Sequence, residues 1–512
     1  MSPRVSAPQT NYAKSPSPDS TSQLLPTTRL YFAGYHLWEI SFHNGMPSFS
    51  ADGESWIKAQ TGEYANFPKL GVATWQTLQH THDLALPTVT NPEMPERKIT
   101  EKYFSLFCSA MHLVFPIVDP VLFEDTINTA YEPCKGPPSP ARMSAQACVL
   151  SFLSNVSLME GNLEMMPIDG NVCATKALSL IQQALLDTTI TGLQALFMQG
   201  MFYMFSGDFQ TASKFHSLAC RAMFILGAHT LADECPPHVS LDEADRSWRV
   251  KVHLRQPPAI NDDYCDLTFP RCYQTSLSGF ICERDGMPSF PGELRLSLIK
   301  SKSSKLLYSA EALHKSDAEL LRHIRELDDE LERWRLSIDP KFRPTFSSCP
   351  NKCVGDPEAS GSQKMLVLFA SLEYYYLIAT MHQAMGRCHA WARDKNGGSD
   401  AVRSSLALSV EASRSTLILL RAGTDSLLGE SFWMIVLYPI SASLTIFFNI
   451  LLNPLSARAE EDLDLLRGSS GLIKCMRARR LTPNEILHIS MIEEFVEEMT
   501  RLGTCAIAKA HR

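Results

Sequence analysis

Helical periodicity is clearest between Asp208 and Leu231, where apolar or small side chains recur every three to four residues. Asp208 supplies a helix-starting signal and Gly227 a helix-ending signal. Two neighbouring stripes are formed by Ala212, His216, Ala219, Met223 and Leu226, and by Phe215, Leu218, Ala222 and Ile225. A narrow polar side remains, formed by Lys214, Ser217 and Arg221. The pattern predicts a helix that is buried over most of its circumference.

The same periodicity predicts helices along most of the chain. One begins at Thr100 and is stopped by Pro116, and Asp119 followed by Pro120 caps the next. Further helices are predicted at about 143–158, 171–187, 189–205, 364–390, 400–422 and 430–452, with a last one from Pro483. No stretch of alternating residues predicts a sheet. We therefore expect an all-α fold, a large array of antiparallel helices joined by short connections.

Residues 299–337 form the longest amphipathic run. Its apolar side carries Leu313, Leu320, Ile324, Leu327, Leu331, Trp334 and, just past its end, Ile338. The run has few clean heptads, so the pattern favours ordinary helix packing over a coiled coil.

Composition divides the chain into three parts. Residues 1–27 are rich in Ser, Pro and Thr and predict a disordered tail. Aromatic residues with Pro and Gly punctuation predict an N-terminal helical lead-in over 28–98, packed on the main body. The main helical domain is expected over 99–512.

Charge and cysteine usage narrow the class of protein. The net charge of −8 over 512 residues gives no overall attraction to nucleic acid. The 14 cysteines are scattered singly, and no secretory signal pattern is present, so we expect a reduced intracellular compartment with most cysteines in the core.

The stretch 432–452 has no charged residue for 21 positions. That is long enough to cross a bilayer, but Pro439, Asn449 and three hydroxyl side chains favour a helix buried inside the body. No membrane association is expected, although a membrane-anchored protein remains an alternative.

The residues that could bind a metal or carry out catalysis are better interpreted as structural. Cys349 and Cys353 lack further ligands for zinc, and the acidic loop around Asp262 lacks the glycine and glutamate of a calcium loop. His216 and His229 are expected to be packing residues, and the basic cluster 474–480 a solvated helix end. Motifs for phosphate loops, dinucleotide binding and hydrolases are missing, so we expect no catalytic, cofactor or metal residue and no enzyme.

Three motifs in order resemble the regulatory region, or middle homology region, of fungal zinc binuclear cluster transcription factors. The first is the Phe-Pro-Ile-Val-Asp stretch that begins at Phe115 and Pro116. The second is the helix end carrying Arg221, Leu226, Gly227 and His229, and the third is the loop carrying Pro257, Pro258, Asp262, Asp263, Asp266 and Pro270. The resemblance spans roughly 100–270 and gives these residues structural roles.

The resemblance implies a nuclear transcription regulator that acts through a protein partner or a small-molecule effector. Partners would include a second copy of the chain or a zinc-cluster factor, and DNA would be contacted only indirectly or through a missing N-terminal module. The family's cluster needs Cys-x2-Cys pairs, and this chain has none. Zinc is expected only in full-length relatives. The alternatives are a helical scaffold, an enzyme of unrecognised type, or a truncated product without function.

One departure from the family lies at the junction of Arg255 and Gln256. Relatives carry an apolar helix before the Pro-Pro pair, whereas here Trp248–Arg255 runs directly into it. A missed exon and a real deletion both produce this junction. If the helix is absent, the large side chains that it covered are left unburied. Each of them then costs about 1.5–3 kcal/mol of folding free energy.

Overall fold

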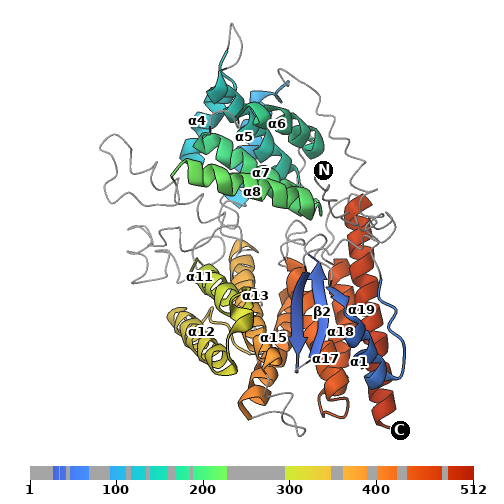
Figure 1. The fold of residues 1–512 in the computed structure, drawn as a ribbon. Coiled ribbons are helices and arrows are strands. Elements are labelled where there is room, and N and C mark those ends of the chain that lie inside the picture. Colours follow the sequence, from blue (N-terminus) through green and yellow to red (C-terminus); the bar gives the residue numbers. More distant parts are fainter. Residues whose placement is uncertain are drawn as a thin grey trace, which may run out of the picture.

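The computed structural model describes residues 27–33, 35–41, 47–68, 93–110, 117–133, 139–158, 168–184, 188–227, 294–346, 361–388, 400–423, 435–475 and 483–512. Within these ranges the chain is almost wholly helical, which confirms the predicted all-α class. Figure 1 shows two stacked groups of helices. We call them the upper body (α3–α8) and the lower body (β1–β3, α1 and α11–α19). Residues 1–26 and the Arg255–Gln256 junction lie outside the described residues.

The upper body is built around one central helix. Its elements are α3 (Arg97–Ala110), α4 (Pro120–Ala130), α5 (Pro140–Ser157), α6 (Gly170–Ala184), α7 (Ile190–Phe205) and α8 (Phe209–Ile225). Helix α5 is buried at every residue from Ser144 to Val156 because α4, α6 and α7 all pack on it. Phe152 lies at the centre, with ring centroids of Phe107 and Phe123 at 5.3 and 4.7 Å.

Local capping explains where these helices begin. The Asp119 side chain accepts hydrogen bonds from the N–H groups of Val121 and Leu122, and Pro120 occupies the first turn, as the sequence predicts. Helix α3 begins three residues before the predicted start and buries Tyr103, Phe104 and Phe107 as expected.

Helix α8 confirms the predicted ends but not the predicted burial. Asp208 accepts a hydrogen bond from Thr211 N–H, and Gly227 has a φ of +68°, which ends the helix in the left-handed conformation. However, Leu218 is 42% exposed and Ile225 65% exposed. The prediction of near-complete burial was wrong because α7 covers one face of α8, where Phe215 and Ala222 are buried, whereas Leu218 and Ile225 of the same stripe lie away from it.

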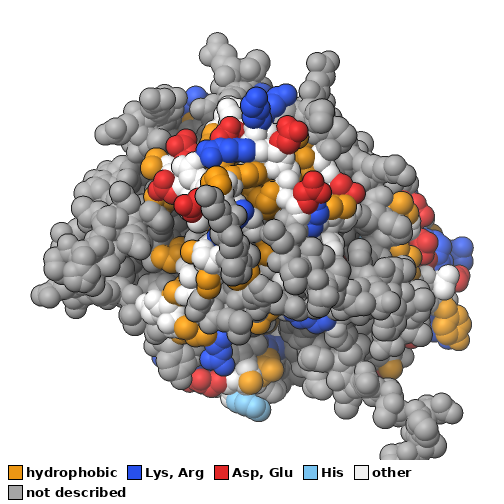
Figure 2. All heavy atoms as spheres, turned by 90° about the horizontal axis from the view of Figure 1, so that it is seen from above, with side chains coloured by type: hydrophobic (Ala, Val, Ile, Leu, Met, Phe, Trp, Pro, Cys, Tyr) orange, Lys and Arg blue, Asp and Glu red, His pale blue; other side chains and the backbone are white. Residues whose placement is uncertain are grey.

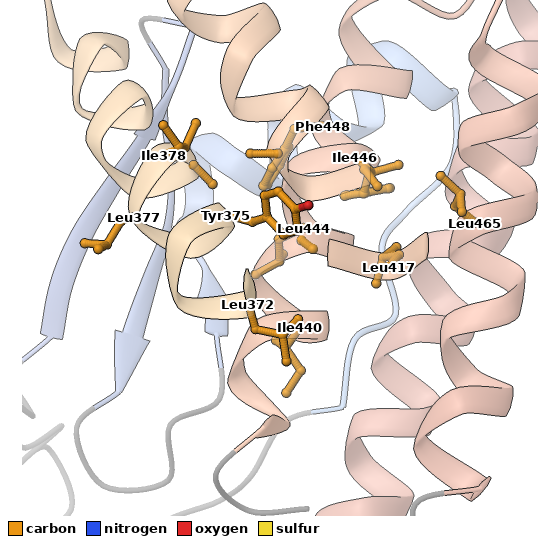
Figure 3. Packing of buried hydrophobic residues seen from close by; sticks show 14 of the residues in the cluster. Leu372, Tyr375, Leu377, Ile378, Leu417, Ile440, Leu444, Ile446, Phe448 and Leu465 are labelled. Atoms are coloured by element: carbon orange, nitrogen blue, oxygen red, sulfur yellow. The ribbon is translucent and has the colours of Figure 1, made fainter. Parts of the chain in front are cut away.

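The lower body contains the larger core. Its long helices are α11 (Leu294–Ser303), α12 (Asp317–Ser337), α13 (Gly361–Gln383), α15 (Asp400–Gly423), α17 (Leu437–Leu452), α18 (Ala459–Cys475) and α19 (Pro483–Ala510). Figure 3 shows Tyr375 and Ile378 of α13 meeting Leu444 and Phe448 of α17 in its interior. Thr482, which the sequence predicts as the N-cap of α19, lies outside the described residues.

The predicted run 299–337 is not one helix. Helix α11 ends at Ser303, a π-helical turn covers Ser304–Tyr308, a 3-10 turn covers Ala312–His314, and α12 starts afresh under Ser316. Ser316 and Glu319 form a capping box, which is the local reason for the restart. The apolar seam from Leu320 to Ile338 is buried, but Leu313 in the 3-10 turn is 51% exposed.

The lead-in is only partly helical, so the expectation of helices alone there was wrong. Strands β1 (Thr27–Phe32), β2 (Tyr35–Ser41) and β3 (Pro47–Phe49) form an antiparallel sheet in the order β1-β2-β3. Helix α1 (Ala51–Thr61) follows. Alternation does not stand out in the sequence because β3 has only 3 residues and a shift of register between Leu30 and Tyr31 interrupts β1.

The lead-in is joined to the last helix of the chain. Glu498 accepts a hydrogen bond of 2.7 Å from the Asn66 N–H, and Arg501 donates one of 3.0 Å to the Tyr64 carbonyl. Phe67 packs on Phe495 with ring centroids 4.8 Å apart. The two hydrogen bonds join residues 432 and 437 positions apart in the sequence.

The apolar stretch 432–452 supplies α17, whose residues from Ile440 to Leu451 are almost all buried in the lower body. Within the described ranges, one helix, Lys364–Arg387, is long and apolar enough to cross a membrane by length and composition alone. The structure buries 72% of its most apolar window. Core helices of soluble proteins pass the same test.

The two bodies share residues across their boundary. Phe205, from the end of α7, belongs to the core of the lower body, and Met365, from the start of α13, belongs to the core of the upper body. Each body therefore inserts a side chain into the other.

Candidate functional site

The structure describes only part of the family-like motifs. Phe115, Pro116, His229, Pro257, Pro258, Asp262, Asp263, Asp266 and Pro270 lie outside the described residues. Arg221 points to solvent from α8, Leu226 is half-buried against the upper core, and Gly227 ends the helix. The described chain does not assemble these three residues into a site, and their structural role stays a prediction.

A groove of about 570 Å³ lies in the lower body, between α15, the end of α17 and the connection to α18. It is lined by Ala407, Val410, Arg414, Asn449, Leu452, Asn453, Pro454, Leu455 and Ser456. Residues 407, 410 and 414 follow helical spacing, so one face of α15 forms one wall. The volume falls within the range of about 300–1,000 Å³ typical of small-molecule sites.

A buried ion pair forms the polar wall of the groove. Arg414 is 8% exposed and holds Asp462 of α18 in a two-pronged contact: Nε donates to Oδ1 at 2.6 Å and Nη2 donates to Oδ2 at 2.8 Å. Asn449 of α17 adds a hydrogen bond of 3.2 Å from Nδ2 to the same Oδ2. Three helices are thereby tied together at one carboxylate.

Further charges extend this network toward solvent. Arg414 Nη1 donates to Glu411 Oε2 at 3.1 Å, and Arg458 Nη1 donates to the same oxygen at 2.9 Å. Burial alone would lower the pKa of Arg414, but its hydrogen bonds and charge contacts with Asp462 and Glu411 outweigh burial and raise that pKa. Arg414 therefore stays charged, as a bidentate contact to carboxylate requires.

Sequence reasoning did not identify this site. Arg414 and Asp462 are 48 residues apart, and neither belongs to a motif. A signal was present nonetheless: Arg414 interrupts an otherwise uncharged stretch, Ala412–Leu420, of a helix whose neighbouring positions are buried. A charged residue on a buried face indicates a partner elsewhere in the fold.

A second polar cluster joins α12, α13 and α15. His382 lies 3.1 Å through Nε2 from Asp328 Oδ1 and 3.0 Å through Nδ1 from Ser405 Oγ. The residue types are those of a hydrolytic triad, but there the serine contacts Nε2 and the carboxylate contacts Nδ1. Ser405 is buried, and it lines neither the groove nor the small cavity beside Thr188 and Thr189 in the upper body. The arrangement is typical of a histidine packed in a core rather than of a catalytic one.

Cys349, Cys353 and the acidic loop around Asp262 lie outside the described residues. Among the described residues, no group of three or more His, Cys, Asp or Glu side chains could hold a metal ion. Burial raises the pKa of both the Cys173 and Cys388 thiols to about 11, so these cysteines stay protonated in the core. His216 is also affected by burial, which lowers its pKa, and it lies 3.6 Å from Cys220 Sγ.

Charges of both signs are mixed on the face of the molecule shown in Figure 2. Among the described residues visible there, Lys and Arg side chains are interspersed with Asp and Glu around small hydrophobic areas. These visible residues do not form the basic stripe that is typical of a nucleic-acid interface.

Comparison with known proteins identifies two similar curated chains. Both are described as "ABC-transporter-regulating transcription factor", one from Aspergillus fumigatus and one from Aspergillus oryzae. Each is 25% identical to this chain over 464 residues, which cover 83% of this chain and 50% of the relative. The chain thus spans about half the length of the curated relatives it matches. No protein-family model matches it.

Proposed function

We propose that this chain is a regulatory part of a fungal transcription regulator and acts in the nucleus through a protein partner or a bound effector. The observation that carries the proposal is the similarity to two fungal transcription factors over 83% of the chain. The helical fold and the mixed surface charge are in keeping with a regulatory region rather than a DNA-reading module. DNA would then be reached through another protein or another segment.

A fusion experiment tests this proposal. The full chain is fused to an unrelated DNA-binding module and expressed in yeast with a reporter gene that carries the module's binding site. We expect reporter transcription to differ at least about threefold from that of the module alone, and the fusion to be found in the nucleus. An unchanged reporter, with the fusion protein intact and nuclear, would contradict the proposal.

The relatives' names indicate which genes to measure in the source organism. We propose that genes for ABC transporters are among those whose transcripts change when the gene for this chain is deleted. Transcripts of the deletion strain are compared with those of the same strain carrying a restored copy. A transcript set without any ABC transporter gene would overturn this narrower proposal and leave the regulatory role to the fusion experiment.

A hydrolytic enzyme is less well supported. Ser405 would have to reach a substrate, but it is buried, and its contact to His382 uses the wrong ring nitrogen. The two relatives are described as transcription factors rather than enzymes.

A further inference from the structure

The groove between α15 and α17 combines an apolar and a polar wall. Ala407, Val410, Leu452 and Leu455 supply apolar surface, and Leu455 is 64% exposed at the rim. Arg414 and Asn449 supply the polar side. Apolar lining with a few fixed polar groups is typical of sites that hold and orient small organic molecules.

The charged groups in and behind the polar wall are paired with one another. Arg414 is paired with Asp462 and Glu411, and Arg458 is paired with Glu411 and with Glu461. A ligand carboxylate or phosphate would have to compete with these acids for the arginines. A ligand cation would have to compete with the arginines for the acids. Neither kind of ion is therefore favoured.

Hydrogen-bond donors remain at the same wall. An arginine side chain has five N–H donors, and three of those in Arg414 are used in the contacts to Asp462 and Glu411. The other two have no partner among the described residues. Because the guanidinium is held on two sides, its position is fixed before any ligand arrives, which reduces the entropy lost on binding.

We propose that this groove binds an uncharged, partly apolar organic molecule whose carbonyl or ether oxygen accepts a hydrogen bond from Arg414. The molecule's apolar part would lie against Val410, Leu452 and Leu455. The inference rests on the groove alone and names the class of effector that the proposed regulator would sense. It can therefore hold or fail independently of the role in transcription.

Two dyes of similar size and opposite character test the ligand class. Nile red is uncharged and carries a carbonyl oxygen, whereas 8-anilinonaphthalene-1-sulfonate is an anion. Fluorescence titration of the purified full chain should show saturable binding of Nile red, and the sulfonate should bind at least about tenfold more weakly.

Substitution places the dye in the groove. Ala407 is exposed on α15, so Ala407→Trp should fill the groove without disturbing the core and weaken Nile red binding about tenfold or more. Ala508→Trp, at an exposed position of α19 that does not line the groove, is the matched control and should bind as the unchanged chain does. Leu455→Gln, at the exposed rim, gives a second and milder reduction if Ala407→Trp fails to fold.

Three results would overturn the proposal. The first is unchanged Nile red affinity in both folded groove variants. The second is an equal loss in Ala508→Trp, which would show binding elsewhere or general unfolding. The third is tighter binding of the sulfonate than of Nile red, which would show that the groove prefers an anion. The dye titrations do not measure transcription. A negative result in the fusion experiment would therefore contradict the role in transcription without contradicting the ligand site.

Discussion

Gly53 of α1 lies against the backbone of Leu37 in β2, so closely that a Cβ on Gly53 would stand 2.0 Å from the Leu37 carbonyl oxygen. Ser50 reinforces this contact, because its N–H donates to the same oxygen at 3.1 Å while its Oγ accepts from Gly53 N–H at 3.0 Å. The start of α1 is thereby fixed on the sheet. Only glycine fits there without a shift of one of the two backbones.

Gly53→Ala should therefore destabilise the protein by about 1–3 kcal/mol, the usual cost of forcing extra atoms into a packed site. The matched control is Gly471→Ala in α18, where no atom lies within 4 Å of the added Cβ. That change should be neutral or stabilise by about 0.5–1 kcal/mol, because alanine favours a helix. Urea unfolding measures the free energy of unfolding of both variants. Equal changes in the two would contradict the close contact between Gly53 and Leu37.

Removing one partner of the buried pair should be costly. Asp462→Ala removes the two-pronged partner of the buried, charged Arg414 and leaves it only Glu411, so we expect a loss of about 3–5 kcal/mol. Asp464→Ala removes the exposed partner of Arg467 on the same helix and should cost less than about 1 kcal/mol. Thermal and urea unfolding measure both. A loss in Asp462→Ala no larger than in Asp464→Ala would show that the buried pair contributes little.

Glu498 should make part of the stability depend on pH. Burial opposes its ionisation, but hydrogen bonds from Arg501 and the Asn66 N–H outweigh burial, so its pKa is lowered from 4.5. Below pH 4.5 the unfolded chain then binds more protons at this group than the folded chain, and the stabilisation is lost as the pH falls through the folded-state pKa. Glu498→Gln should cost about 1 kcal/mol at neutral pH and progressively less below pH 4.5.

The neighbouring Glu497 provides the control for this pH dependence. It is exposed, so Glu497→Gln should retain the acid sensitivity of the unchanged chain. Unfolding free energies of the three proteins are compared from neutral pH down to about pH 3. If the unfolding free energies of Glu498→Gln and the unchanged chain differ by the same amount over that whole range, ionisation of Glu498 does not contribute to the pH dependence of stability.

The purified chain should not bind specific DNA by itself. Its net charge of −8 repels the phosphate backbone, which dominates protein–DNA affinity. Gel retardation with promoter fragments of ABC transporter genes, at low and physiological salt, should show no sequence-dependent shift. Retardation at nanomolar protein that an unrelated duplex does not compete away would disprove this.

Helix positions were predictable because their causes are local. Asp119, Asp208 and Gly227 act within one turn of their own helices, and their roles follow directly from the sequence. The sheet was not predictable in the same way, since Phe32 and Leu37 are buried by packing on residues far along the chain, such as Phe448. Exposure of Leu218 likewise depends on which neighbours cover α8.

The groove was beyond sequence reasoning for a related reason. Its wall joins Glu411 and Arg414 to Arg458 and Asp462, and the pairing depends on how α15 packs on α18. No motif records that packing. A buried arginine could have been suspected from its apolar surroundings, but its partners and the open space beside it could be found only in the folded chain.

The contacts between the lead-in and α19 affect the order of events during synthesis. Asn66 leaves the ribosome 432 residues before Glu498, which at about 5–20 residues per second is a delay of roughly 20–90 seconds. Throughout that interval Phe49 and Phe67 lack Phe495, the ring against which both finally pack. The first segment of the described fold is thus completed by α19, which is translated much later, and until then its apolar face is available to chaperones.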